Sequence, residues 1–328
     1  MKVLHLSFHK GCINDIKYVL NNLNIQNEYM FIDDFGEQKY NMTRKRANIL
    51  WEKYKNEFEK YDCIITSDTV PLCRIFLENN WSKKLIIWIC NRFDYTHLPV
   101  RDGPFPDPEY YDIIRKAVMM DNVYVIGYTK FENFYCKNKR NIDIGNKVIK
   151  PSGGIDEIYK NNNIIKEELK ETLFIPPYHN DTIYMNLSEH LNTLGLKNVC
   201  CRYNGPMDLL NYKAVVHIPY AWNNLALFES FSLGIIYFIP SKEFLYKLMI
   251  ERDNFFWQDN EYLKDHIELS EWYTEEHKDV FVYFNSWEHL KELVCNIDYE
   301  NQKNKIKEFF EEHKANTFNS WKEILFNS

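Results

Sequence analysis

The chain has 328 residues, which is long enough for two domains of ~150 residues each. Hydrophobic residues make up 45% and charged residues 27%, a balance that excludes a disordered chain and predicts a packed globular protein. The formal net charge is −7, and an acidic surface disfavours nucleic acid as a partner because it repels a phosphate backbone.

The N-terminal stretch MKVLHLSFHKG leads directly into a strand pattern, without the basic start and long apolar run of a signal peptide. No segment approaches the roughly 18 uncharged apolar residues of a membrane span. None of the eight cysteines forms a Cys-x-x-Cys pair, and Cys63 and Cys90 lie in apolar runs. We therefore expect a cytoplasmic protein with free thiols and no integral membrane contact.

The first half of the chain alternates short apolar runs with helical patterns. Strands are predicted at residues 2–8, 29–32, 63–66, 84–90, 123–128 and 147–150, and helices at 13–23, 43–60, 71–79 and 109–120. The run LIIWIC within 84–90 is apolar throughout, which predicts a strand buried on both faces. Strands that alternate with helices predict a parallel sheet with crossover helices.

A second alternating set follows residues 151–170, where Gly, Pro and an Asn run predict a linker. Strands are predicted at 172–175, 199–203, 214–219 and 235–239, and helices at 182–195, 207–211 and from about 223. The tail from residue 287 is charged and repeats apolar residues at helical spacing. The chain is thus an α/β protein with two sheets in tandem, hinged near residue 160 and followed by a helical tail.

The stretch PYAWNNLALFESFSLG at 219–234 places a polar loop between a strand and an apolar helix that carries Glu229. Open parallel sheets bind ligands at the carboxyl ends of their strands, and a helix start there suits a diphosphate. A carboxylate would repel the phosphates and could instead accept hydrogen bonds from a ribose diol. In the alternative interpretation, Asn224 caps the helix and Glu229 reaches solvent or a neighbouring Lys.

Residues 199–241 resemble the donor-binding half of a GT-B glycosyltransferase. They run from a strand through a Gly-containing loop to a strand ending in Pro, then a polar loop, Leu-x-Glu in a helix, and a Gly five residues after that Glu. Glu229 and Gly234 match this spacing. The resemblance implies that Glu229 contacts the ribose of a UDP- or GDP-sugar, which is a substrate, and that neither a metal nor another cofactor is bound.

The resemblance also implies two Rossmann-like domains facing across a cleft. We expect an acceptor-binding domain at 1–160, a donor-binding domain at 161–305, and a helix at 306–328 that packs back on the first domain. Further donor-binding residues are expected in the polar loop and among cations that could hold the diphosphate: Tyr220, Asn223, Asn224, Leu225, Arg202, Lys213 and Lys150.

The acceptor is expected at strand ends of the first domain. His9 or Asp15 could deprotonate an acceptor hydroxyl, and Asp94 is a third catalytic candidate. Expected acceptor-binding residues are Lys10, Gly11, Asp68, Asn91, Arg92 and His97. Structural alternatives remain open: Asp15 or Asp68 caps a helix, His9 packs, and Arg92 pairs with Asp94.

Together these features predict metal-independent transfer of a sugar from a nucleotide-sugar to a hydroxyl of a glycan or glycoconjugate, with inversion or retention left open. One alternative is a nucleotide-sugar epimerase of the same architecture. Another is an inactive GT-B protein that binds a glycan or a partner.

Overall fold

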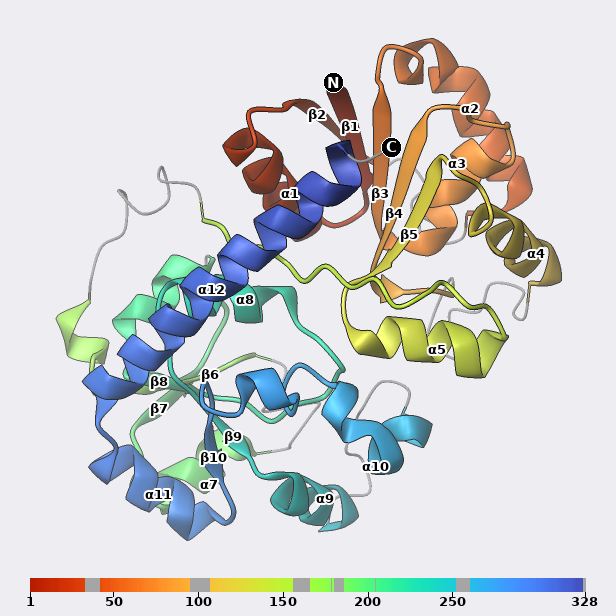
Figure 1. The fold of residues 1–328 in the computed structure, drawn as a ribbon. Coiled ribbons are helices and arrows are strands. Elements are labelled where there is room, and N and C mark those ends of the chain that lie inside the picture. The colour runs from red at the N-terminus through yellow and green to blue at the C-terminus, as the bar shows by residue number, and fades with distance from the viewer. Residues whose placement is uncertain are drawn as a thin grey trace. The chain divides into compact units, whose positions relative to one another are not determined.

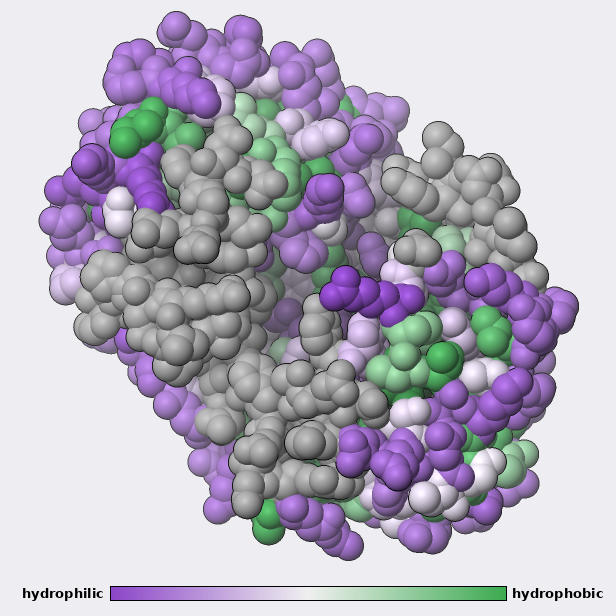
Figure 2. Space-filling view, turned by 180° about the vertical axis from the view of Figure 1, so that it is seen from behind, coloured by the Kyte–Doolittle hydropathy of each residue, from purple (hydrophilic) through white to green (hydrophobic). Residues whose placement is uncertain are grey.

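The computed structural model describes residues 1–32, 42–94, 107–155, 166–177, 179, 186–203, 205–251 and 260–326. The chain divides into two compact units, which are Met1–Ser152 with Asn316–Ser328, and Gly153–Ala315. None of the helices in the described stretches combines the length and apolar composition needed to cross a bilayer. The face shown in Figure 2 is mostly hydrophilic over its described residues.

The first unit is built on a five-stranded parallel sheet in the order β2-β1-β3-β4-β5 (Figure 1). Its strands are β1 (Lys2–Ser7), β2 (Gln26–Phe31), β3 (Cys63–Thr69), β4 (Lys84–Arg92) and β5 (Val123–Gly127). Its helices are α1 (Lys10–Asn22), α2 (Arg44–Phe58), α3 (Arg74–Leu77), α4 (Pro108–Ala117) and α5 (Lys130–Arg140), with the 3-10 turn η2 (Val70–Cys73) before α3.

The centre of this sheet is fully covered, as the sequence predicts. Every side chain of β4 from Leu85 to Ile89 is completely buried. The indole nitrogen of Trp88 donates to the carbonyl oxygen of Ile149 at 2.8 Å, and its ring meets that of Trp321 edge-on at 5.7 Å. Trp321 belongs to the last part of α12 (Tyr299–Phe326), which re-enters the first unit at Asn316. The end of the chain therefore completes the core of the first unit.

The second unit also has a five-stranded parallel sheet, in the order β10-β9-β8-β6-β7. Its strands are β6 (Leu173–Ile175), β7 (Asn198–Cys200), β8 (Ala214–Val216), β9 (Tyr237–Pro240) and β10 (Val282–Phe284). Around it lie α7 (Leu187–Thr193), η6 (Pro206–Asn211), α8 (Leu225–Ser232), α9 (Lys242–Glu251), α10 (Leu263–His266), α11 (Trp287–Asn296) and most of α12, with short 3-10 turns at Glu167–Leu169, Asn260–Tyr262, Ile267–Leu269 and Glu275–His277.

Two predicted elements differ from the structure. Residues 147–150 do not form a strand, because a single bridge between Gly127 and Val148 is too short to build a ladder. The helix predicted at 182–195 is described only as α7, and residues 182–185 lie outside the described residues. Several elements were not predicted. They are α5, which begins with a capping box of Thr129 and Glu132, the helices α9 and α10, and the short strand β10.

Candidate functional site

The strand order places a ligand-binding edge in the second unit. After β6 the chain continues to β7 on one side and then crosses to β8 on the other, so the strand order reverses between β6 and β8. Open α/β sheets bind ligands at the carboxyl ends of the strands that flank such a point. The segment that leaves β8 there is the polar loop at residues 217–224, which leads into α8.

The start of α8 is defined by Asn224. Its backbone is extended, with φ −151°, and its side-chain oxygen accepts a hydrogen bond from the backbone N–H of Ala226 at 3.0 Å. Asn224 is therefore the helix cap, as the alternative interpretation of the sequence predicted. Capping leaves the positive end of the helix dipole at this edge. Tyr220, Asn223 and Leu225 lie half-buried around it.

The polar loop is held from behind by the segment that precedes β10. The indole nitrogen of Trp272 donates to the carbonyl oxygen of Ala221 at 3.0 Å. The backbone N–H of Glu271 donates to the carbonyl oxygen of Trp222 at 2.9 Å. Trp222 is itself buried. These bonds fix the backbone of the loop before any ligand arrives, which reduces the entropy lost on binding.

Glu229 lies half-buried in the second turn of α8, among tyrosines. Burial, with the nearby charge of Glu229 and the phenol of Tyr220, raises the pKa of Tyr203 to about 12. Burial and the same carboxylate also raise the pKa of Tyr237. The carboxylate thus lies in a partly dry environment beside hydroxyl groups, where hydrogen bonds to a charged acceptor are strong.

Two buried histidines at this edge were not among the predicted site residues. His217 follows β8 directly, and its ring stacks on Trp272 at 4.1 Å and lies 4.4 Å from the ring of His179, which follows β6. Burial lowers the pKa of His179 to about 3, and burial with the neighbouring His179 holds the pKa of His217 well below its usual range. Both rings are therefore neutral at physiological pH. The histidine directly after the apolar strand in VVHIP was the signal that could have identified His217.

Because His217 stays neutral in the folded protein, acid should destabilise the fold. Below about pH 6.5 the unfolded chain protonates this histidine while the folded chain does not, so the free energy of unfolding falls by about 2 kcal/mol between about pH 7 and pH 5 for this one group. His217→Phe keeps a ring against Trp272 and removes the titration. Urea unfolding at both pH values should show a loss about 2 kcal/mol smaller in the variant, and an unchanged pH dependence would contradict this assignment.

Comparison with solved structures decides the architecture. Sucrose-phosphate synthase from Thermosynechococcus elongatus aligns with a TM-score of 0.56 over 100% of both chains at 8% identity. Arabidopsis thaliana UGT89C1 complexed with UDP aligns with a TM-score of 0.51 over 99% of this chain and 98% of that one at 9% identity. The chain has the GT-B fold.

Other comparisons complete this result. A UDP-GlcNAc 2-epimerase from Neisseria meningitidis bound to UDP-GlcNAc aligns over 100% of both chains at 13% identity, with a lower TM-score of 0.48. No protein-family model matches the sequence, and no curated protein matches it. The likeness is thus one of GT-B architecture, and the chemistry must be argued from the residues.

The first unit of this GT-B chain has its own point of strand reversal, between β1 and β3. His9 follows β1 and caps α1, because its Nδ1 accepts the backbone N–H of Cys12 at 3.3 Å. A neutral ring that accepts at Nδ1 carries its proton on Nε2, so His9 presents a donor as it stands. His9 and Lys10 are exposed, and Gly11 lies in the first turn of α1.

Asp15 does not cap α1. It is buried, and its carboxylate accepts hydrogen bonds from the backbone N–H of Ser152 at 3.1 Å and from its hydroxyl at 2.8 Å. The structural alternative assigned the cap to Asp15 and packing to His9, and the structure reverses these two roles. Asp15 holds the end of the first unit's main segment in place, which argues against its predicted role as the base.

Asp68 lies at the carboxyl end of β3, on the edge where the strand order reverses. It is buried and has a left-handed backbone, with φ +71°, at an irregularity in the pairing of β3 with β4. Such a backbone is uncommon outside glycine, and strained positions of this kind cluster at functional sites. Asn91 and Arg92 end β4, but their side chains lie outside the described part of the structure, as does the whole of His97.

Asp94 has a structural role that its predicted catalytic role did not anticipate. Its carboxylate accepts hydrogen bonds from the Nε of Arg140 at 2.9 Å, from the hydroxyl of Tyr111 at 2.8 Å and from that of Tyr135 at 2.6 Å. Asp94 therefore pairs with Arg140, whereas the alternative interpretation paired it with Arg92. A buried carboxylate with three such donors ties α4 and α5 together.

The predicted phosphate-binding cations lie in different places. Arg202 is exposed two residues after β7, at the carboxyl edge. Lys213 precedes β8, so it lies at the opposite, amino edge, where its Nζ pairs with Glu171 at 3.1 Å. This position argues against the predicted role of Lys213 in binding the donor, because a parallel sheet presents the two ends of a strand on opposite edges. Lys150 is half-buried in the first unit.

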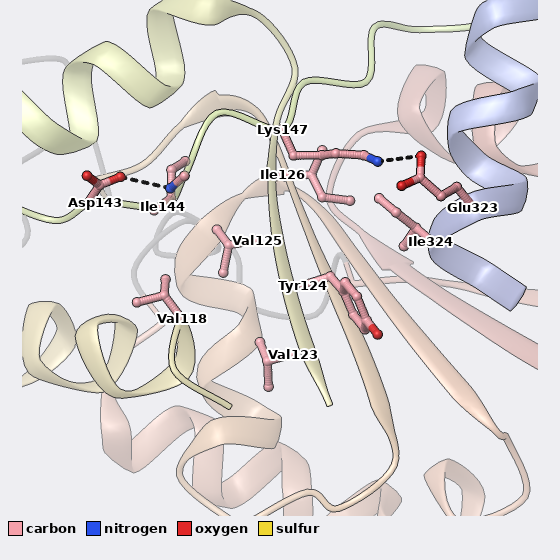
Figure 3. Close-up of a pocket in the computed structure, with 11 residues that line it drawn as sticks. Val118, Val123, Tyr124, Val125, Ile126, Asp143, Ile144, Lys147, Glu323 and Ile324 are labelled. Carbon is pink, nitrogen blue, oxygen red and sulfur yellow. Dashed lines mark hydrogen bonds and ion pairs between the residues drawn. The ribbon is translucent and has the colours of Figure 1, made fainter. Parts of the chain in front are cut away.

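A cavity of about 480 Å³ lies along β5 in the first unit, and none of its lining residues is a predicted site residue (Figure 3). Its rim carries an ion pair between Lys147 and Glu323 at 2.8 Å. The wall is mainly aliphatic, and Val118, Val123, Val125, Ile126, Ile144 and Ile324 contribute to it. Within the described residues, no three His, Cys, Asp or Glu side chains gather in a way that could hold a metal ion.

Proposed function

We propose that this GT-B protein is a glycosyltransferase that moves a sugar from a nucleotide-sugar to a hydroxyl of a glycan or glycoconjugate. The observation that carries the proposal is the position of Glu229, half-buried beside the capped start of α8 at the edge where the strand order reverses. The UDP held by the Arabidopsis thaliana relative supports a nucleotide at this fold.

The charged diphosphate and the neutral ribose of the donor would bind at different positions along this edge. The start of α8 attracts the diphosphate, and Arg202 adds a positive charge from the end of β7. The ribose hydroxyls donate to Glu229. As the sugar leaves, negative charge grows on the diphosphate, so the helix dipole and Arg202 stabilise the transition state more than the ground state.

The acceptor would bind at the carboxyl edge of the first unit's sheet. His9 and Asp68 both lie at that edge, whereas Asp15 and Asp94 are held by structural contacts. We assign the proton acceptor to Asp68, because the capping ring of His9 accepts at Nδ1 and carries its proton on Nε2, and we leave the stereochemical outcome open. Alanine variants of each, compared for transfer at saturating donor, identify the base as the residue whose loss lowers kcat.

A thermal-shift screen against UDP, GDP, CMP and their sugars tests the donor class. A ligand at about one hundred times its dissociation constant stabilises the native state by roughly 2.7 kcal/mol, which gives a clear rise in melting temperature. A sugar nucleotide that stabilises the protein should then release free nucleoside diphosphate only when an acceptor hydroxyl is added. Interconversion of the donor without an acceptor would indicate an epimerase instead, and no stabilisation by any nucleotide would contradict the proposal.

A further inference from the structure

The strand β5 is an edge strand of the first unit's sheet, with β4 on its inner side. The backbone N–H of Leu85 donates to the carbonyl oxygen of Asn122 at 2.8 Å, and the N–H of Tyr128 donates to that of Ile89 at 2.9 Å. In a parallel ladder, successive residues turn their N–H and C=O groups to opposite edges of the strand. The even-numbered residues of β5 therefore bond to β4, and the odd-numbered residues face outward.

The outward edge of β5 is covered at its two ends and open between them. The N–H of Val123 donates to the carbonyl oxygen of Met120 at 3.2 Å. The N–H and C=O of Gly127 are both bonded to the backbone of residues 147–149, at 3.1 and 3.0 Å. Among the described residues, none bonds to the outward N–H and C=O of Val125. An open strand edge of this kind is a template for one further strand.

The cavity of about 480 Å³ lies directly against this open edge (Figure 3). Four consecutive residues of β5, from Val123 to Ile126, line it. A pocket on one face of a sheet meets only alternate residues, because successive side chains point to opposite faces. The cavity therefore runs along the backbone edge of β5, where an added strand would lie.

The side chains on the two sides of the cavity differ in polarity. Figure 3 shows an aliphatic group on one side of β5, formed by Val118, Val123, Val125 and Ile144. The group on the other side is mixed and contains Tyr124, Ile126, Ile324 and the Lys147–Glu323 ion pair. A strand in the cavity would point alternate side chains to these two sides. Apolar side chains suit the first side, and small hydroxyl side chains suit the second.

The charges around the cavity favour an uncharged occupant. Three lining residues are charged, and each is paired within the first unit: Lys147 with Glu323 at 2.8 Å, and Asp143 with Lys137 at 2.8 Å. A charged segment would have to compete with these pairs, whereas an uncharged segment leaves them intact.

Exposed apolar side chains follow directly on two segments that line the cavity. Met119 and Met120 come after Val118 and are 82% and 39% exposed, and Phe326 lies two residues after Ile324 and is 58% exposed. Exposed large hydrophobic side chains that gather near one cavity are typical of a protein-binding surface.

We propose that the open edge of β5 binds an extended, uncharged segment of a partner protein, which adds a strand to the sheet beside residues 147–149. The outward N–H and C=O of Val125 and the outward C=O of Val123 bond to the backbone of this segment. Its side chains alternate between apolar and small polar types to match the two sides of the cavity. The site lies within the first unit and does not depend on the proposed sugar transfer.

A second copy of the chain does not fit this edge through its own β5. In an antiparallel pair of two β5 strands centred on Val125, Val123 of one copy would lie opposite Gly127 of the other. The outward groups of Gly127 are already bonded to residues 147–149, which occupy the space that the second strand would need. A single narrow segment avoids this overlap.

Residue-resolved hydrogen exchange, measured by NMR on the native protein, tests whether the edge is open. Without ligand, the N–H of Val125 should exchange at least about 100-fold faster than that of Ile126, which bonds to β4. The probe is a capped hexapeptide of alternating valine and threonine, with a short Gly-Ser-Lys tail for solubility. At about 1 mM, which is enough to detect a weak complex, it should slow exchange at Val125 at least about tenfold. Equal exchange of Val125 and Ile126 in the free protein, or no slowing by the peptide, would overturn the proposal.

Two modified peptides test whether binding uses the backbone. One carries N-methyl groups on its three valines and the other on its three threonines. Because alternate N–H groups of a strand point to opposite edges, only one of the two sets faces β5. One modified peptide should therefore bind at least about tenfold more weakly than the parent, and the other should bind about as well. Equal loss or equal retention in the two peptides would show that no strand is added and would overturn the proposal.

Two variants test the position of the site by fluorescence anisotropy of the labelled hexapeptide. Val118→Lys places a charge on the aliphatic side of the cavity and should weaken binding at least about tenfold. Ile49→Lys is the matched control, because Ile49 is 54% exposed on α2 and does not line the cavity. Equal affinity of the two variants would overturn the proposal. A dimer in light scattering that Val118→Lys dissociates would assign the edge to a second copy and would overturn it as well.

Discussion

Replacing Asp94 by alanine is expected to lower the free energy of unfolding by about 3–5 kcal/mol, because it removes one partner of a mostly buried ion pair. The Arg140 side chain, of which 19% is exposed, would lose its counter-charge. The hydroxyls of Tyr111 and Tyr135 would lose their acceptor at the same time. Urea or guanidinium unfolding of the wild type and the variant measures the difference.

Asp112 on α4 offers a matched control for this experiment. It pairs with Arg115 at 2.7 Å, but 65% of its side chain is exposed, and an exposed pair of this kind contributes less than about 1 kcal/mol. Asp112→Ala should therefore leave the unfolding midpoint almost unchanged. Equal stability of the two variants, together with a selective loss of sugar transfer in Asp94→Ala, would contradict the structural role and support the catalytic role that the sequence predicts for Asp94.

The sheet architecture could be predicted because its signals are local. The apolar run of β4 and the repeated change between strand and helix patterns lie within short windows of the sequence, and both strands and helices formed there. The strand predicted at residues 147–150 does not form, because a strand needs a partner along its whole length and only Val148 has one. The three residues of β10 were too few to show a period.

Part of the candidate site was also predictable from charge and position. The pattern of a polar loop and a carboxylate after a strand predicted the helix start at Asn224 and the position of Glu229 on that helix, while their roles in donor binding stay predictions. The position of Lys213 before β8 was equally local, and the same rule about strand ends could have excluded it. The partners of Asp94 could not be found in this way, since they lie 17 to 46 positions away and meet only in the folded chain.

Glu229→Gln is expected to weaken binding of the nucleoside diphosphate by roughly 10–100-fold, because a hydrogen bond to a charged group contributes about 1.5–3 kcal/mol. The amide keeps the size of the side chain and removes its charge. Glu171→Gln is the matched control, since Glu171 lies in the same unit but at the amino edge, beside Lys213. Isothermal titration calorimetry should show wild-type affinity for the control variant.

The pairing of Glu229 with the ribose diol is tested most directly by titrating wild-type protein and Glu229→Gln with a nucleoside diphosphate and with its 2′,3′-dideoxy analogue. Wild-type protein should bind the analogue roughly 10-fold or more weakly than the parent nucleotide, whereas the variant should bind the two about equally, since the missing diol and the missing charge remove the same interaction. If both proteins discriminate equally against the analogue, Glu229 does not hold the ribose, and the donor site proposed for the second unit is wrong.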